Sequence, residues 1–173
     1  VAYNAWAGEY LVVFEYGQAP EAIHARRVSA AGGLPGAEYT VVSQPLTYFP
    51  DLAAGPWDLT GGYVVVWDDL RGADRDLYGR VVLAGSDNAF DGGDFSIDSG
   101  PGSQYHAAIA RAPDSGRYLV AWSDDRATDT SDDDIYARHL TADANLYGSS
   151  FALSDAPGWQ GEAAAAGAGG PDS

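Results

Sequence analysis

The stretch Tyr-Val-Val-Val-Trp at Tyr63–Trp67 decides the fold, because it returns with small changes at two other places in the chain. Related runs occupy Tyr10–Phe14 and Tyr118–Trp122, about 55 residues away on either side. Two further markers keep this spacing, one at Ile23–Arg26, Leu77–Arg80 and Ile135–Arg138, the other at Tyr39–Val41, Phe95–Ile97 and Phe151–Leu153. Repeats of this length with several short strands are typical of β-propeller blades.

Each repeat contains four candidate strands, in which alternating apolar residues and β-branched side chains favour β structure over helix. The second, third and fourth strands contain the three markers described above. The first is a short run of small residues, found at Val1–Asn4, Leu52–Ala54, Ala107–Ala110 and Ala163–Ala166. The sequence therefore predicts an all-β, propeller-type array of four-stranded antiparallel blades.

The number of repeats predicts an unfinished ring. One repeat domain covers residues 1–173, with repeats at about 1–46, 47–102 and 103–158 and the start of a fourth at about 159–173. This makes three blades plus one extra strand, whereas propellers close with typically four to eight blades. We therefore expect either further blades in a longer chain or a homo-oligomer that completes the ring. A β-sandwich of the same length is the alternative.

The charge of the chain limits its partners. The 173 residues carry 25 acidic against nine basic side chains, a formal net charge of −16. Such a surface repels phosphate backbones and anionic lipids, which argues against nucleic-acid and membrane-surface binding. No apolar run approaches the ~18 residues of a membrane span, and the absence of cysteine excludes disulfides and thiolate metal sites.

An acidic constellation follows the second strand in two of the repeats. Its members are Asp69, Arg71 and Asp76 in the middle repeat and Asp124, Arg126 and Asp134 in the third. We interpret these residues as turn pins, with an arginine held between two carboxylates by charge-assisted hydrogen bonds. The first repeat has Tyr16, Gln18 and Ala22 at these positions and has lost the set.

The same loop of the third repeat offers a second interpretation. Closely spaced oxygens of Asp124, Asp129, Asp132 and Asp134 are of the kind that Ca²⁺ selects. The arginine within the loop favours the turn pin, and the glycine and final glutamate of an EF-hand loop are missing. Calcium is therefore the less favoured hypothesis for this loop.

Four residues outside these loops are candidates for contact with a ligand. Trp6, Trp57 and Trp159 lie near the first strands, where an exposed indole can stack on a sugar, although packing is the commoner role. His106 precedes a first strand, close to the expected central funnel, but no nucleophile is paired with it in the sequence. Motifs of sialidase-type propellers, phosphate-binding loops and zinc proteases do not occur.

The pattern Tyr-Leu-Val-Val-Trp-x-Asp-x-Arg followed by Asp-Ile-Tyr-Gly-x-Arg-Val, approximated at residues 63–82 and 118–140, resembles repeats of large secreted or surface-attached bacterial β-propeller-like proteins. This resemblance implies an extracellular or cell-surface location. It also implies a non-catalytic structural or interaction module that self-associates or belongs to a larger surface protein or appendage, with a protein or glycan as ligand. The alternative is a carbohydrate-active propeller, either a glycoside hydrolase or a lectin.

Overall fold

The structure is a computed structural model that describes residues 1–17, 21–55, 61–126 and 133–167. Within these residues the chain forms twelve strands and no helix. The strands are β1 Ala2–Asn4, β2 Glu9–Tyr16, β3 Ala22–Ser29, β4 Tyr39–Val42, β5 Tyr48–Ala54, β6 Gly62–Asp69, β7 Asp76–Leu83, β8 Phe90–Asp98, β9 Gln104–Arg111, β10 Tyr118–Asp124, β11 Asp134–Leu140 and β12 Leu146–Ser154.

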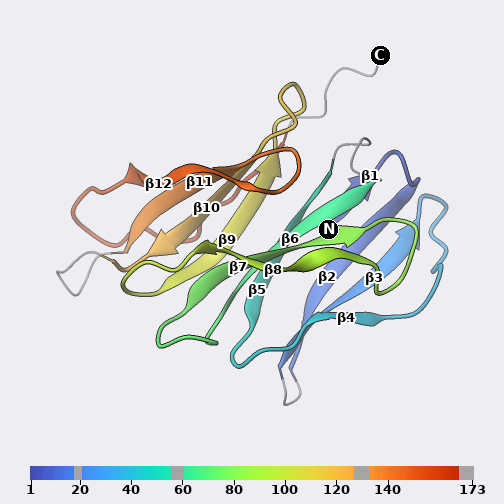
Figure 1. The fold of residues 1–173 in the computed structure, drawn as a ribbon, viewed down its shortest axis with the longest axis horizontal. Helices are drawn as coiled ribbons and strands as arrows, with labels where there is room; N and C mark the ends of the chain where they lie inside the picture. The colour runs from blue at the N-terminus through green and yellow to red at the C-terminus, as the bar shows by residue number, and fades with distance from the viewer. Residues whose placement is uncertain (18–20, 56–60, 127–132, 168–173) are drawn as a thin grey trace.

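The strands form three four-stranded antiparallel sheets, each built from four consecutive strands. We call them sheet 1 (β1–β4), sheet 2 (β5–β8) and sheet 3 (β9–β12), and they lie in this order from right to left in Figure 1. The prediction of an all-β chain with four strands in each repeat is confirmed. The described residues form no closed ring, so the propeller arrangement stays a prediction.

Two hydrophobic clusters join the sheets. Alternate residues of a strand point to opposite faces of its sheet, so β6 supplies both clusters. Tyr63, Val65 and Trp67 pack against sheet 1, and Val64 and Val66 pack against sheet 3. Burial on both faces explains why the β6 sequence is a continuous apolar run rather than an alternating one.

Repeated polar contacts reinforce the two boundaries between sheets. Arg80 of sheet 2 donates to the carbonyl of Val41 in sheet 1, at 2.5 Å. Its equivalent Arg138 in sheet 3 donates to the carbonyl of Ile97 in sheet 2, at 2.8 Å. Each sheet therefore contacts its predecessor in the same way, as expected if the repeats are copies of one packing unit.

A second repeated contact involves a bulge near the start of the first strand. Phe49 and His106 have positive φ angles of 52° and 56°, and the pairing register shifts at both sites. The bulge turns the backbone N–H of Phe49 toward Glu15 Oε1 at 2.8 Å, and that of His106 toward Asp68 Oδ1 at 3.2 Å. In both cases the acceptor directly follows the aromatic residue that ends the apolar run in the second strand of the preceding repeat. The bulge therefore links each repeat to the one before it.

The predicted extra strand at Ala163–Ala166 is wrong, because residues 161–167 form no strand in the structure. The alanines have the right composition, but an isolated segment has no neighbour with which to build a ladder of hydrogen bonds. The segment nevertheless lies against sheet 3, where the N–H of Glu162 donates to Ser123 Oγ at 3.1 Å.

Candidate functional site

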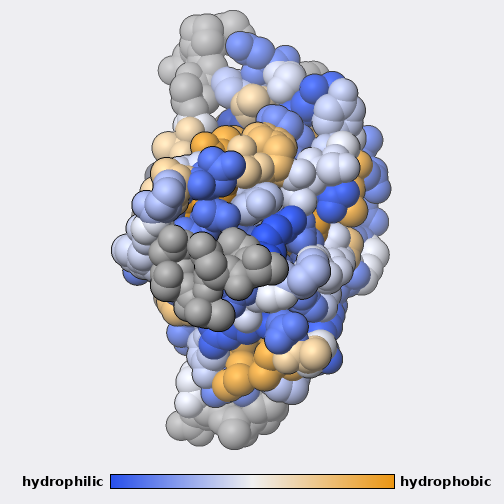
Figure 2. All heavy atoms as spheres, turned by 90° about the vertical axis from the view of Figure 1, so that its left-hand side faces the viewer, coloured by the Kyte–Doolittle hydropathy of each residue, from blue (hydrophilic) through white to orange (hydrophobic). Residues whose placement is uncertain are grey.

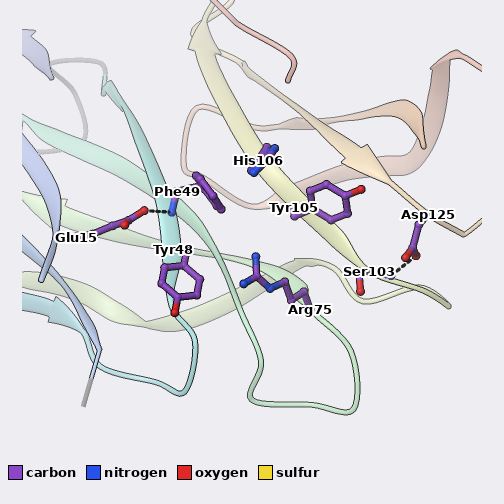
Figure 3. Close-up of a pocket in the computed structure, with 8 residues that line it drawn as sticks. All are labelled: Glu15, Tyr48, Phe49, Arg75, Ser103, Tyr105, His106 and Asp125. Carbon is purple, nitrogen blue, oxygen red and sulfur yellow. Dashed lines mark hydrogen bonds between the residues drawn. The ribbon is translucent and has the colours of Figure 1, made fainter. Parts of the chain in front are cut away.

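The largest cavity described lies at the end of the sheets where the bulges occur. Its volume is about 720 Å³, and Figure 3 shows its lining. The walls come from the end of β2, the start of β5, the start of β9 and nearby loops. The lining residues are Glu15, Tyr48, Phe49, Arg75, Ser103, Tyr105, His106 and Asp125.

Aromatic rings form one wall of the cavity. The ring of His106 meets that of Phe49 edge to face with centroids 4.0 Å apart, and meets that of Tyr105 at 5.1 Å. Burial, followed by a hydrogen bond to Asp133, raises the pKa of Tyr105. Aromatic faces next to the carboxylates of Glu15 and Asp125 form a surface to which a neutral polyhydroxyl ligand or a cation is chemically suited.

A buried carboxylate lies directly behind this wall. Asp68 is completely buried, accepts from the His106 N–H and pairs with Arg75 Nη1 at 3.1 Å. The guanidinium of Arg75 also lies 4.9 Å from the ring centre of Tyr48. Burial raises the pKa of Asp68 to about 7, because the charged carboxylate loses more hydration than its hydrogen bond and ion pair restore.

The first of the two predicted turn pins is built around Asp69. Its carboxylate is fully buried and accepts from the indole N–H of Trp67 at 2.8 Å. It also accepts from Arg71 through Nε and Nη2, at 2.9 and 2.6 Å, and from the Arg71 backbone N–H at 3.1 Å. The guanidinium stacks over the ring of Tyr78 with 3.8 Å to its centre.

The third repeat contains the same arrangement around Asp124. This carboxylate is fully buried and accepts from the Trp122 indole at 2.7 Å and from Arg126 Nε at 2.7 Å. The Arg126 guanidinium lies 4.0 Å from the ring centre of Tyr136. Its hydrogen bond to Asp124 is the main cause that raises the pKa of Arg126, so this cation keeps its charge.

The second carboxylate on each arginine differs from the predicted one. Arg71 pairs with Asp94 of β8 at 3.0 Å, while Asp76 instead accepts from the Tyr78 hydroxyl at 3.3 Å. Arg126 pairs with Asp98 of the preceding sheet at 3.2 Å. The arginine of the third repeat thus fixes its own turn and also the boundary between sheets 2 and 3.

The first repeat replaces this constellation by an aromatic stack. The ring of Tyr16, which stands at the position of Asp69, lies parallel to that of His24 with centroids 4.4 Å apart. His24 stands at the position of Tyr78. The stack thus occupies the place that the arginine and tyrosine occupy in the other two repeats.

Part of the predicted calcium loop lies outside the described residues, namely Asp129 and Asp132. Both oxygens of Asp124 already accept from arginine and tryptophan, and Asp134 lies opposite Asp124 across the β10–β11 ladder. No group of three or more metal-binding side chains occurs in the part of the chain that is described. Calcium binding stays a prediction.

Three of the four predicted ligand-contact residues lie within the described part of the chain. His106 lines the cavity, whereas Trp6 and Trp159 are exposed and are not among the lining residues. The Trp159 indole donates to Asp133 at 2.7 Å. Trp57 lies outside the described residues. Whether any of them contacts a ligand stays a prediction.

Sequence reasoning did not identify most of the cavity. The sequence does contain a signal for Glu15 and Asp68. In all three repeats a polar residue directly follows the aromatic residue that ends the apolar run of the second strand. Phe49 had none, because the bulge that turns it toward the cavity leaves no mark in the sequence.

Comparison with models of protein families and with curated protein sequences finds no match. Among the described residues no helix is long and apolar enough to cross a membrane.

Proposed function

We propose that this chain is a non-catalytic structural and interaction module of an extracellular or surface protein, joined through its two outer sheet faces to further sheets of the same kind. The observation that carries the proposal is a difference in exposure between equivalent residues. Leu153 of β12 is 54% exposed, while its equivalents Val41 and Ile97 are 1% and 0% exposed. The residue type is kept, but none of the described sheets covers Leu153.

The opposite outer face also exposes a residue whose equivalent in another repeat is buried. Tyr10 of β2 is 40% exposed, while its equivalent Tyr63 is 1% exposed and donates from its hydroxyl to the Glu9 carbonyl at 3.0 Å. We call the face with Tyr10, Val12 and Phe14 the leading face. The face with Leu119, Phe151 and Leu153 is the trailing face. Figure 2 looks onto the side of sheet 3 and shows hydrophobic patches among hydrophilic side chains.

These faces support an association role because they match surfaces that are already packed within the chain. Exposed apolar patches of this kind mark interaction sites in soluble proteins. The extracellular location is supported by the resemblance of the repeats to those of secreted bacterial proteins, and the net charge of −16 suits a module that must stay in solution.

An extended chain tests this proposal. Adding a copy of residues 4–46 after Gly167 supplies the missing second, third and fourth strands to the trailing face. We expect the melting temperature to rise by about 10 °C, because burying side chains such as Phe151 and Leu153 contributes roughly 1.5 to 3 kcal/mol each. The matched control carries Tyr→Asp and Val→Asp replacements at the copied positions of Tyr10 and Val12, which belong to the leading face. If the extended chain melts at the temperature of the original chain, the outer faces do not accept sheets of this kind.

Sugar binding in the cavity is a second candidate function, favoured by the aromatic wall beside Glu15 and Asp125. It predicts binding on a glycan array that is lost in Phe49→Ala. A hydrolase would in addition cleave chromogenic glycosides and lose that activity in Glu15→Gln, because glycosidases use paired carboxylates. Hydrolysis of this kind would overturn the non-catalytic assignment. Tyr147→Ala, which changes an exposed aromatic side chain outside the cavity, is the control.

A further inference from the structure

The segment at 160–167 already occupies the position of a fourth first strand. Glu162 has a φ of 59° and donates its N–H to Ser123. Phe49 and His106 make the same contact with the preceding sheet, with the same sign of φ. The segment is therefore seated on sheet 3 as β5 is seated on sheet 1 and β9 on sheet 2, although it has no strand beside it in the described residues.

Sheet 1 has the complementary gap. Its first strand, β1, is only three residues long and pairs with Glu9, Tyr10 and Leu11 of β2. In sheets 2 and 3 the ladder continues further, with Leu52 opposite Val65 and Ile109 opposite Val120. Val12 and Val13 of β2, which are equivalent to Val65 and Val66, have no first-strand partner in the described structure. This stretch of β2 is an open edge with its hydrogen-bonding groups available.

The pairing register of the segment at 160–167 matches that of the open edge of β2. Aligning Glu162 with Phe49 and His106 makes Ala165 equivalent to Leu52 and Ile109. The residue that faces Leu52 in sheet 2 is Val65, whose counterpart in sheet 1 is Val12. Ala165 is thus expected opposite Val12, and Ala164 opposite Val13. These are positions that β1 leaves empty, while β1 fills the next two, at Leu11 and Tyr10.

We propose that a second copy of this chain docks head to tail, its leading face on the trailing face of the first copy. Residues 162–165 of the first copy then pair with the open edge of β2 in the second. This inference rests on the proposed function and adds the identity of the partner. A strand added to an open sheet edge is a recurrent mode of protein association.

Two hydrogen bonds are expected to repeat across the new boundary. Arg26 is the equivalent of Arg80 and Arg138, which each donate from Nη1 to a carbonyl of the preceding sheet. In the second copy Arg26 would donate to the Leu153 carbonyl of the first copy, as Arg80 donates to Val41. The Tyr10 hydroxyl would donate to the Arg117 carbonyl, as Tyr63 donates to Glu9.

The contact joins two different faces of the chain. Repeated contacts of this kind can therefore either close into a ring or continue as an open filament of copies. Two copies with three sheets each supply six, which lies within the four to eight blades of closed propellers. We therefore expect a dimer in which both boundaries are formed. Each copy carries a net charge of −16, so added salt should strengthen the dimer by screening the repulsion between copies.

The mass of the 173-residue chain in solution tests the proposal. Light scattering is expected to give twice 18.1 kDa. A buried charge without a partner is costly, so Leu153→Asp and Tyr10→Asp should each raise the dissociation constant at least about 30-fold. The control is Leu34→Asp, which changes an equally exposed leucine in the β3–β4 loop, 58% exposed, and should leave the dimer intact. Circular dichroism and melting of dilute samples check that every variant folds.

Mixing the two weakened variants identifies the arrangement. Tyr10→Asp keeps an intact trailing face and Leu153→Asp an intact leading face, so their mixture should form a one-to-one dimer that neither forms alone. A mixture that stays monomeric while the unchanged chain is dimeric would overturn the proposal. A variant that stays dimeric alone would also overturn it, because a contact between like faces needs only one of the two faces. Loss of the dimer in Leu34→Asp would place the contact elsewhere, with the same consequence.

Comparing the unchanged chain with the extended chain distinguishes a failure of the dimer proposal from a failure of the proposed function. If the unchanged chain is monomeric up to ~100 μM but the extended chain is stabilised, the second copy is excluded and further repeats of a longer chain cover the faces. If the extended chain gains nothing either, both proposals fall.

Discussion

Replacing Asp124 by alanine is expected to lower the free energy of unfolding by about 3 to 5 kcal/mol. The carboxylate is fully buried and accepts from the Trp122 indole and from Arg126. Alanine removes all these acceptors together. It leaves a buried indole N–H unpaired and takes from the partly buried Arg126 the nearer of its two carboxylates. Denaturant unfolding followed by tryptophan fluorescence measures the loss.

Three further variants show whether this cost comes from the proposed network. Asp69→Ala should be destabilised to a similar degree, because Asp69 makes the same contacts with Trp67 and Arg71. Asp124→Ala combined with Arg126→Ala should cost less than the sum of the single changes, since both single changes remove the same ion pair. Asp114→Ala, at an exposed loop position, should change little. A loss in Asp124→Ala as small as that in Asp114→Ala would contradict the account.

Replacing Asp68 by serine is expected to change how stability depends on pH. In the folded chain the pKa of Asp68 is raised to about 7 by burial, against an ordinary value of 3.8. The folded state therefore holds this proton more tightly than the unfolded state does. The resulting stability is fully present below pH 4 and is lost as pH rises through 7, by roughly 4 kcal/mol in total.

Serine cannot titrate, yet it is the residue that the third repeat uses at this position, where Ser123 accepts from Glu162. Relative to the unchanged chain, Asp68→Ser should thus be most stable above pH 7 and should lose that advantage between pH 7 and pH 4. Urea unfolding of both chains at a series of pH values measures the difference. Asp114→Ser is the control, because it makes the same replacement at an exposed loop position. A difference between Asp68→Ser and the unchanged chain that does not vary with pH would show that Asp68 is charged in the folded state throughout this range.

The strands could be predicted because each carries a local signal that is repeated. The run at Tyr63–Trp67 lies within β6. Its consecutive apolar residues indicate a strand that is buried on both faces. The pairings of Asp69 with Arg71 and of Asp124 with Arg126 could also be predicted, since the partners are only two positions apart in the sequence. Local spacing and strand geometry are enough in these cases.

Contacts that depend on the placement of separate strands could not be predicted. Asp94 and Asp98 reach their arginines from β8, which lies far from both loops in sequence, so Asp76 was the nearest available choice. The cavity depends on bulges at Phe49 and His106, which have no consistent residue type. The alanines at 163–166 show why a strand can be predicted where none forms. A composition suited to a strand does not produce a hydrogen-bonded ladder unless a second strand lies beside it.

The bulge that joins successive sheets has an evolutionary consequence. Its hydrogen bond comes from the main chain, so the side chain at the same place takes no part in holding the frame together. The second repeat, the third repeat and the segment after it carry phenylalanine, histidine and glutamate there, and the acceptors are equally varied. Selection can therefore alter the chemistry at the mouth of the cavity one residue at a time, while the scaffold that supports it stays unchanged.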